Sequence, residues 1–93
     1  MGRADWQFLM TKEDIKSLLE AGLVGAQTHI EGDDGVHFAA RVVFAGFTGL
    51  SSVKRHQLVY GALGGHMGQA IHALSMQTYT PEEWQQQQPF ATL

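Results

Sequence analysis

The chain has 93 residues, of which 44% are hydrophobic and 16% are charged, as is typical of one globular domain with a single core. Its formal net charge of −3 at pH 7 argues against a broadly basic protein that coats nucleic acid. The sequence contains no cysteine, which excludes disulfides and any zinc site closed by thiolates of this chain alone.

The first ten residues show no clear hydrophobic periodicity, so we predict a flexible N-terminal extension over 1–10. The domain is predicted to span 11–88 and to be followed by a C-terminal tail over 89–93, because Pro89 ends the last helix. The N-terminus lacks the basic and apolar regions of a secretory signal, and no apolar stretch approaches the roughly 20 residues that span a bilayer. We therefore expect a cytoplasmic protein with no membrane partner.

A first helix is predicted to begin after Thr11 and to end at Gly22. Threonine is a suitable N-cap, and the acidic side chains of Glu13 and Asp14 favour the positive end of the helix dipole. Glycine commonly ends a helix because it tolerates the backbone conformation required there.

Two strands are predicted next, over 24–31 and 36–45, from the alternation of apolar and polar residues. The Gly-Asp-Asp-Gly sequence at 32–35 is a strong turn signal, so the two strands are predicted to form an antiparallel hairpin. The second strand then has an apolar face and a more polar face. The apolar face carries Phe38, Ala40, Val42 and Phe44, and the other carries His37, Ala39, Arg41 and Val43.

The second half of the chain is predicted to contain a loop over 47–50, a helix over 53–63 capped by Ser51 or Ser52, and a short helical turn over 66–69. A third strand follows from Ile71. The last helix begins after Thr80, where Pro81 suits the first helical position and Glu83 completes a capping box.

This element order, α-β-β-α-(α)-β-α, predicts an α+β fold. The second and third strands are joined through a helix, which favours a right-handed parallel crossover. A hairpin plus one parallel strand gives a mixed three-stranded sheet with helices packed on one face.

Five segments of this sequence, taken together and in order, resemble the BolA family, and above all its shorter IbaG-type members. They are Phe47-Thr48-Gly49, Val53-Lys54-Arg55-His56, Leu58-Val59-Tyr60, Ile71-His72-Ala73-Leu74 and Thr78-Tyr79-Thr80-Pro81-Glu82-Glu83-Trp84. The resemblance covers roughly residues 11–84. It implies a fold similar to the type II KH domain, which agrees with the predicted element order.

The resemblance also implies a small non-enzymatic adaptor that pairs with a monothiol glutaredoxin and shares a [2Fe–2S] cluster with glutaredoxin and glutathione. The family's ligand histidine matches His72, and His37 is the nearest match to a second ligand from the hairpin. Histidine can replace cysteine on one iron of such a cluster, so a chain without cysteine can supply imidazole but cannot hold the cluster alone.

Other readings of these histidines stay open. His72 shares its strand parity with Leu74 and Met76, so the direction in which its side chain points is not settled. Simple solvent exposure explains His37 equally well. His29 and His66 are predicted to be surface residues.

The alternative function implied by the resemblance is that of a DNA-binding transcriptional regulator of stress response and cell morphology, acting through residues 47–63. Lys54, Arg55 and His56 are the candidate nucleic-acid-binding residues, although a solvated helical face explains them as well. Residues 61–64 have the Gly-x-x-Gly spacing of a KH loop but an apolar filling, so RNA binding in the KH manner is not expected.

We expect no enzymatic activity, because the sequence has neither a phosphate-binding glycine loop with lysine nor a nucleophile elbow. Glu82 and Glu83 are adjacent at a helix start, where capping and the helix dipole explain them better than acid–base catalysis does. The free protein is expected to be a monomer or a weak dimer.

Overall fold

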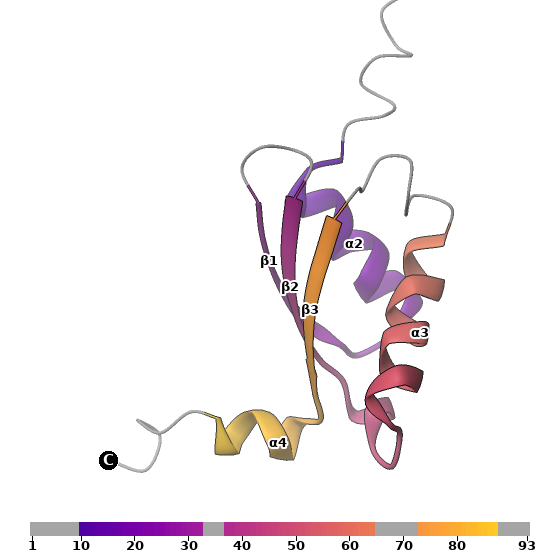
Figure 1. Ribbon diagram of the computed structural model, residues 1–93, viewed down its shortest axis with the longest axis vertical. Coiled ribbons are helices and arrows are strands. Elements are labelled where there is room, and N and C mark those ends of the chain that lie inside the picture. The colour runs from indigo at the N-terminus through magenta and orange to yellow at the C-terminus, as the bar shows by residue number, and fades with distance from the viewer. Residues whose placement is uncertain (1–9, 33–36, 65–72, 88–93) are drawn as a thin grey trace, which may run out of the picture.

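The computed structural model describes residues 10–32, 37–64 and 73–87 (Figure 1). The predicted helical turn over 66–69, the start of the third strand at Ile71, and His66 and His72 lie outside these residues. The elements in chain order are α2 (Lys12–Gly22), β1 (Gln27–Glu31), β2 (His37–Val43), the 3-10 helix η1 (Ala45–Phe47), α3 (Ser52–Leu63), β3 (Ala73–Tyr79) and α4 (Pro81–Gln86).

The three strands form one mixed sheet in the order β1-β2-β3, as predicted. β1 and β2 are antiparallel, with Gln27 opposite Val43. β2 and β3 are parallel, with His37 opposite Ala73, so both strands begin at the same end of the sheet. The α+β fold and the mixed sheet predicted from the sequence are therefore confirmed.

The predicted helix starts are confirmed by their hydrogen bonds. Thr11 forms a capping box with Asp14, in which the Asp14 N–H donates to Thr11 Oγ1 over 3.1 Å and the Thr11 N–H donates to Asp14 Oδ2 over 3.0 Å. Ser51, and not Ser52, caps α3 by accepting the Lys54 N–H. Thr80 caps α4, and its own N–H donates to Glu83. These short-range bonds satisfy backbone groups that a helix end leaves unpaired.

The core lies between the sheet and the two longer helices, α2 and α3, which pack against the same face of the sheet (Figure 1). The alternation predicted for β2 is confirmed, because Phe38, Ala40 and Val42 are all buried on this face. Met10, which the sequence placed in the N-terminal extension, is itself a core residue. The fully buried side chains are Phe47, Ile15, Leu19, Leu63, Val42 and Val59.

Two segments differ from the sequence prediction. β1 begins at Gln27 instead of residue 24, because Gly25 turns the chain with a φ of 92° and leaves Val24 82% exposed. Residues 45–47 form a 3-10 turn instead of the end of a strand and the start of a loop. The physical reason is Phe47, whose ring is fully buried and meets the Phe44 ring edge-on at 5.2 Å.

The opposite face of the sheet is more polar, and among the described residues α4 covers the end of this face where β2 and β3 finish. Trp84 of α4 lies over Arg41, with the guanidinium carbon 4.3 Å from the ring centroid, and its ring also lies 5.3 Å from that of Tyr79. This arrangement explains why Val43 is buried although it belongs to the more polar face of β2. No helix among the described residues is both long and apolar enough to cross a membrane.

Candidate functional site

His37, the predicted second cluster ligand, is the first residue of β2 and is exposed. Its parity places it on the open face of the sheet, opposite to the buried Phe38. Its partner across the ladder is Ala73, which directly follows His72 in the sequence. Adjacent strands lie roughly 4.8 Å apart, so the parallel pairing brings sequence positions 37 and 73 to neighbouring places at one end of the sheet.

His72, the predicted principal ligand, lies outside the described residues, and its role stays a prediction. The side chains of Leu74 and Met76, which share its parity, are half-buried against the core. Within residues 10–32, 37–64 and 73–87, no three histidine, aspartate or glutamate side chains come together in a way that could hold a metal ion.

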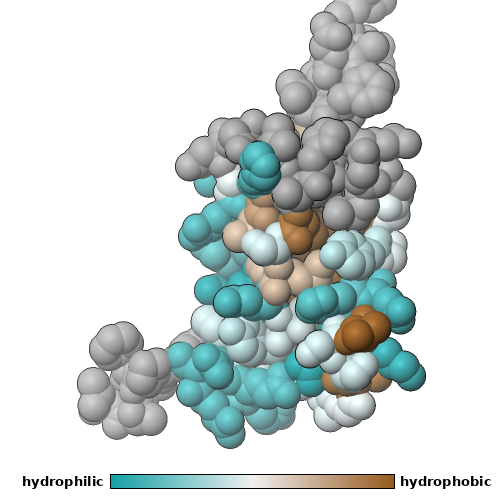
Figure 2. All heavy atoms as spheres, in the orientation of Figure 1, coloured by the Kyte–Doolittle hydropathy of each residue, from teal (hydrophilic) through white to brown (hydrophobic). Residues whose placement is uncertain are grey.

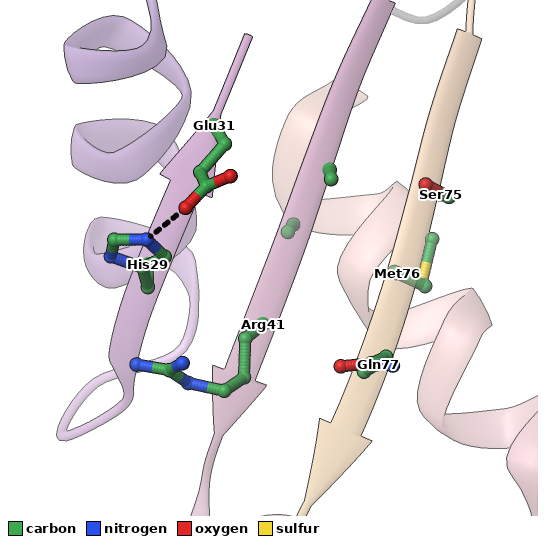
Figure 3. Close-up of a pocket in the computed structure, with 8 residues that line it drawn as sticks. His29, Glu31, Arg41, Ser75, Met76 and Gln77 are labelled. Atoms are coloured by element: carbon green, nitrogen blue, oxygen red, sulfur yellow. Dashed lines mark hydrogen bonds and ion pairs between the residues drawn. The ribbon is translucent and has the colours of Figure 1, made fainter.

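His29, predicted to be a surface residue, is exposed on β1, and its Nε2 atom lies 2.9 Å from Glu31 Oε2. This hydrogen bond lowers the pKa of the Glu31 carboxylate. The pair lies beside Arg41 in an open groove on the polar face of the sheet (Figure 3). The groove has a volume of about 430 Å³ and also includes Ser75 and Gln77 of β3.

Arg55, a candidate nucleic-acid-binding residue from the sequence, forms hydrogen bonds with other parts of the fold. Its Nη1 and Nη2 atoms donate to the two carboxylate oxygens of Glu83 over 2.7 and 3.2 Å, and its Nε donates to the Leu50 carbonyl over 3.0 Å. Its side chain is only 12% exposed and its guanidinium carbon lies 5.7 Å from the Phe47 ring centroid. Arg55 therefore ties α3 to the preceding loop and to the start of α4.

The electrostatics of this contact follow from its geometry. The two-point hydrogen bond from Arg55, helped by the Thr80 N–H, lowers the pKa of Glu83 to about 2. The same carboxylate raises the pKa of Arg55. Sequence reasoning identified the capping role of Glu83 but missed its contact with Arg55, because 28 residues separate the two.

The other two nucleic-acid candidates lie on the same helix. Lys54 is exposed in the first turn of α3, whereas His56 is half-buried. Val53, next to Lys54, is 65% exposed. Of the three residues, only Lys54 is exposed, so it is the one presented to a nucleic-acid backbone without rearrangement.

Comparison with known proteins identifies the family. A sequence profile described as "BolA-like protein" matches residues 16–83. "Acid stress protein IbaG" of Escherichia coli K12 is 41% identical over 76 residues, covering 81% of this chain and 89% of that protein. The "DNA-binding transcriptional regulator BolA" of Vibrio cholerae is 48% identical over 50 residues, covering 54% of this chain and 47% of that protein.

Comparison with solved structures points to the same family. The solved structure of a BolA homologue from Coxiella burnetii superimposes with a TM-score of 0.75 and 47% sequence identity, covering 83% of this chain and 99% of that one. The profile match spans most of the chain, and the relatives share both sequence and fold. This chain belongs to the BolA family.

Proposed function

We propose that this chain is an adaptor that pairs with a monothiol glutaredoxin and shares a [2Fe–2S] cluster with it, in iron–sulfur trafficking or in iron and stress sensing. His72 is the principal ligand in this proposal and His37 the second. The observation that carries it is the position of His37, exposed at the start of β2 and in register with Ala73, the neighbour of His72 in the sequence.

The donor set of the chain supports this division of labour. With no cysteine, the chain offers imidazole and not thiolate, and the glutaredoxin cysteine and glutathione must supply the thiolates. Two histidines on one iron raise the reduction potential of such a cluster, and protonated imidazole cannot coordinate metal. The complex should therefore lose its histidine ligands in acid more readily than a cluster held by thiolates alone.

The test is reconstitution under anaerobic conditions with glutaredoxin, glutathione, ferrous iron and sulfide, followed by visible circular dichroism. We expect the wild-type chain to change the spectrum of the glutaredoxin cluster. His72→Ala should abolish most of that change and His37→Ala a smaller part. His29→Ala is the matched control, because His29 is an exposed histidine on the open face of the sheet and is paired with Glu31. An unaltered spectrum with His72→Ala would refute the ligand assignment.

DNA-binding transcriptional regulation, in stress response and cell morphology, is the second candidate function. The support is that relatives from Vibrio cholerae and Haemophilus influenzae are named DNA-binding transcriptional regulators. We propose that Lys54 makes the principal phosphate contact. Arg55 can contribute only by releasing Glu83, and His56 is half-buried.

Titration with promoter DNA at two salt concentrations tests this second function. Lys54→Ala should weaken binding and reduce the slope of log affinity against log salt by about one, because one phosphate contact is lost. Lys12→Ala removes the same charge from an exposed position at the start of α2 and should leave the slope unchanged. Absence of binding at low salt, or equal effects of the two variants, would reject the DNA-binding proposal.

A further inference from the structure

The two edges of the sheet are built differently. At the β1 edge, α2 covers the strand with side chains: Lys16 Nζ donates to the Thr28 carbonyl oxygen over 2.9 Å and also contacts Glu20. Thr28 Oγ1 in turn donates to Glu20 Oε2 over 2.8 Å. Charged side chains that bind the outer backbone groups of an edge strand prevent another chain from pairing with it.

The β3 edge has no such protection in its sequence. The seven residues of β3, Ala-Leu-Ser-Met-Gln-Thr-Tyr, include no charged residue, proline or glycine. Within the described part of the chain, β2 is the only strand that pairs with β3. A long, uncharged edge strand is a template for pairing with a further strand, because its outward backbone N–H and C=O groups lack ladder partners.

The core side chains of β3 are also less well covered than their neighbours. Leu74 and Met76 are half-buried, whereas their register partners on β2, Phe38 and Ala40, are each only 4% exposed. Figure 2 shows apolar atoms near the centre of this view, with polar atoms beside and below them. A strand added beside β3 would place its own side chains next to the half-buried Leu74 and Met76.

We propose that β3 pairs antiparallel with β3 of a second copy of this chain, giving a six-stranded sheet in the order β1-β2-β3-β3-β2-β1. β3 suits its own copy because a two-fold axis at Ser75 sets Leu74 of each copy opposite Met76 of the other. In this register Ser75 lies opposite Ser75, and position 73 lies opposite position 77. This register joins the half-buried apolar side chains of both copies and brings no like charges together.

Sedimentation equilibrium over a range of concentrations tests the proposal. We expect the apparent mass of the wild-type chain to rise from 10.2 kDa toward twice that value. Ser75→Lys sets two ammonium groups directly across the two-fold axis, which should raise the dimer dissociation constant by at least about tenfold.

Ala39→Lys is the matched control, because Ala39 is exposed on the same face and is the register partner of Ser75, one strand further in. In the dimer the two Ala39 positions are about 14 Å apart, or three strand spacings. This distance exceeds the screening length of about 8 Å at physiological salt, so Ala39→Lys should dimerise like the wild type.

Three outcomes would overturn the proposal. A wild-type chain that stays monomeric at about 1 mM would exclude a second copy as the occupant of this edge. A Ser75→Lys chain that is folded by circular dichroism and dimerises as the wild type does would place the dimer contact elsewhere. Hydrogen exchange gives the third: β3 amides that gain no protection as the wild-type dimer forms would also reject pairing at this edge, whereas protection confined to β3 supports it.

Discussion

The two ends of the sheet differ in how they are covered by contacts with other parts of the chain. At one end β2 and β3 finish, and the Phe44 N–H donates to the Tyr79 carbonyl over 2.9 Å. Phe47, Arg55 and Glu83 close this end with a buried ring and a two-point ion pair, and we call it the closed end. At the other end, the open end, β2 and β3 begin and His37 is exposed.

Under the proposed function, the residues that stabilise the fold and the residues that bind the cluster lie at opposite ends of the sheet. The closed end holds α3, the loop before it and α4 together through contacts between distant parts of the sequence. The open end presents a histidine that does not contribute to the core. Substitutions at the closed end should therefore change the free energy of unfolding, and substitutions at the open end should change the interaction with a partner.

The largest effect is expected for Phe47→Ala. The ring is fully buried and packs edge-on against Phe44, so its loss leaves a cavity and should cost about 3–5 kcal/mol of unfolding free energy. Urea denaturation, monitored by circular dichroism, measures this change in the free energy of unfolding. Leu58→Ala, at a partly exposed position of α3, is the control and should cost much less. If Phe47→Ala and Leu58→Ala lose the same free energy of unfolding, Phe47 is not a main source of stability at the closed end.

A smaller effect is expected for Arg55→Ala, which removes the hydrogen bonds to Leu50 and Glu83. The loss should be about 1 kcal/mol, since Glu83 is partly exposed and water replaces part of the contact. Arg55→Lys keeps the charge but cannot form the two-point pair, so it should be destabilised as well. Lys54→Ala, its exposed neighbour, should change stability by less than about 0.5 kcal/mol. An Arg55→Ala variant with the same free energy of unfolding as the wild type would show that the ion pair does not contribute to stability.

The pH dependence of stability should reveal the same ion pair. The pKa of Glu83 is lowered from 4.5 to about 2 in the folded chain, so the folded state binds its proton less readily than the unfolded state. The stabilisation is therefore complete above pH 4.5 and is lost as the pH falls toward 2. Glu83→Gln removes this titration, and the stability difference between wild type and variant should shrink on acidification. If the stability difference between the wild type and Glu83→Gln stays constant from pH 6 to pH 2, Glu83 is not the group responsible for the pH dependence.

The smallest effect on stability is expected for His37→Ala at the open end. His37 is exposed at the first position of β2, so its replacement should change the unfolding free energy by no more than about 0.5 kcal/mol. When the same His37→Ala protein is reconstituted with glutaredoxin, the circular dichroism spectrum of the cluster should differ from that obtained with the wild type. A variant that is strongly destabilised, yet gives a normal cluster spectrum, would reverse the proposed division between the two ends.

Much of the fold was predictable because its signals are local. Thr11 and Thr80 cap their helices as their sequence context indicates, and the glycine-rich turn between two alternating segments predicts the hairpin. In each case the signal lies within a few neighbouring residues, so local propensity and hydrogen bonding indicate the element without reference to the rest of the fold. The parallel pairing of β2 and β3 followed from the helix between them.

The site was less predictable. Lys54-Arg55-His56 reads as one basic segment, yet the three side chains have different environments once α3 packs. Arg55 faces Glu83, Lys54 faces solvent and His56 is half-buried. Likewise, nothing within a few residues of Trp84 indicates that its ring lies over Arg41. These contacts depend on how helices and strands pack, which a local pattern does not encode.

The sequence by itself determined the helix starts, the hairpin, the element order and the lack of thiolate ligands, because each depends on neighbouring residues or on composition. Only the tertiary structure decided that Arg55 belongs to Glu83, that Phe47 is buried, and that His37 lies across the ladder from Ala73. It also decided that side chains of α2 bind the edge strand β1, and that β2 is the only strand paired with β3 within the described residues. The physical reason is that pairs separated by tens of residues meet only when the register of the sheet and the packing of the helices are set.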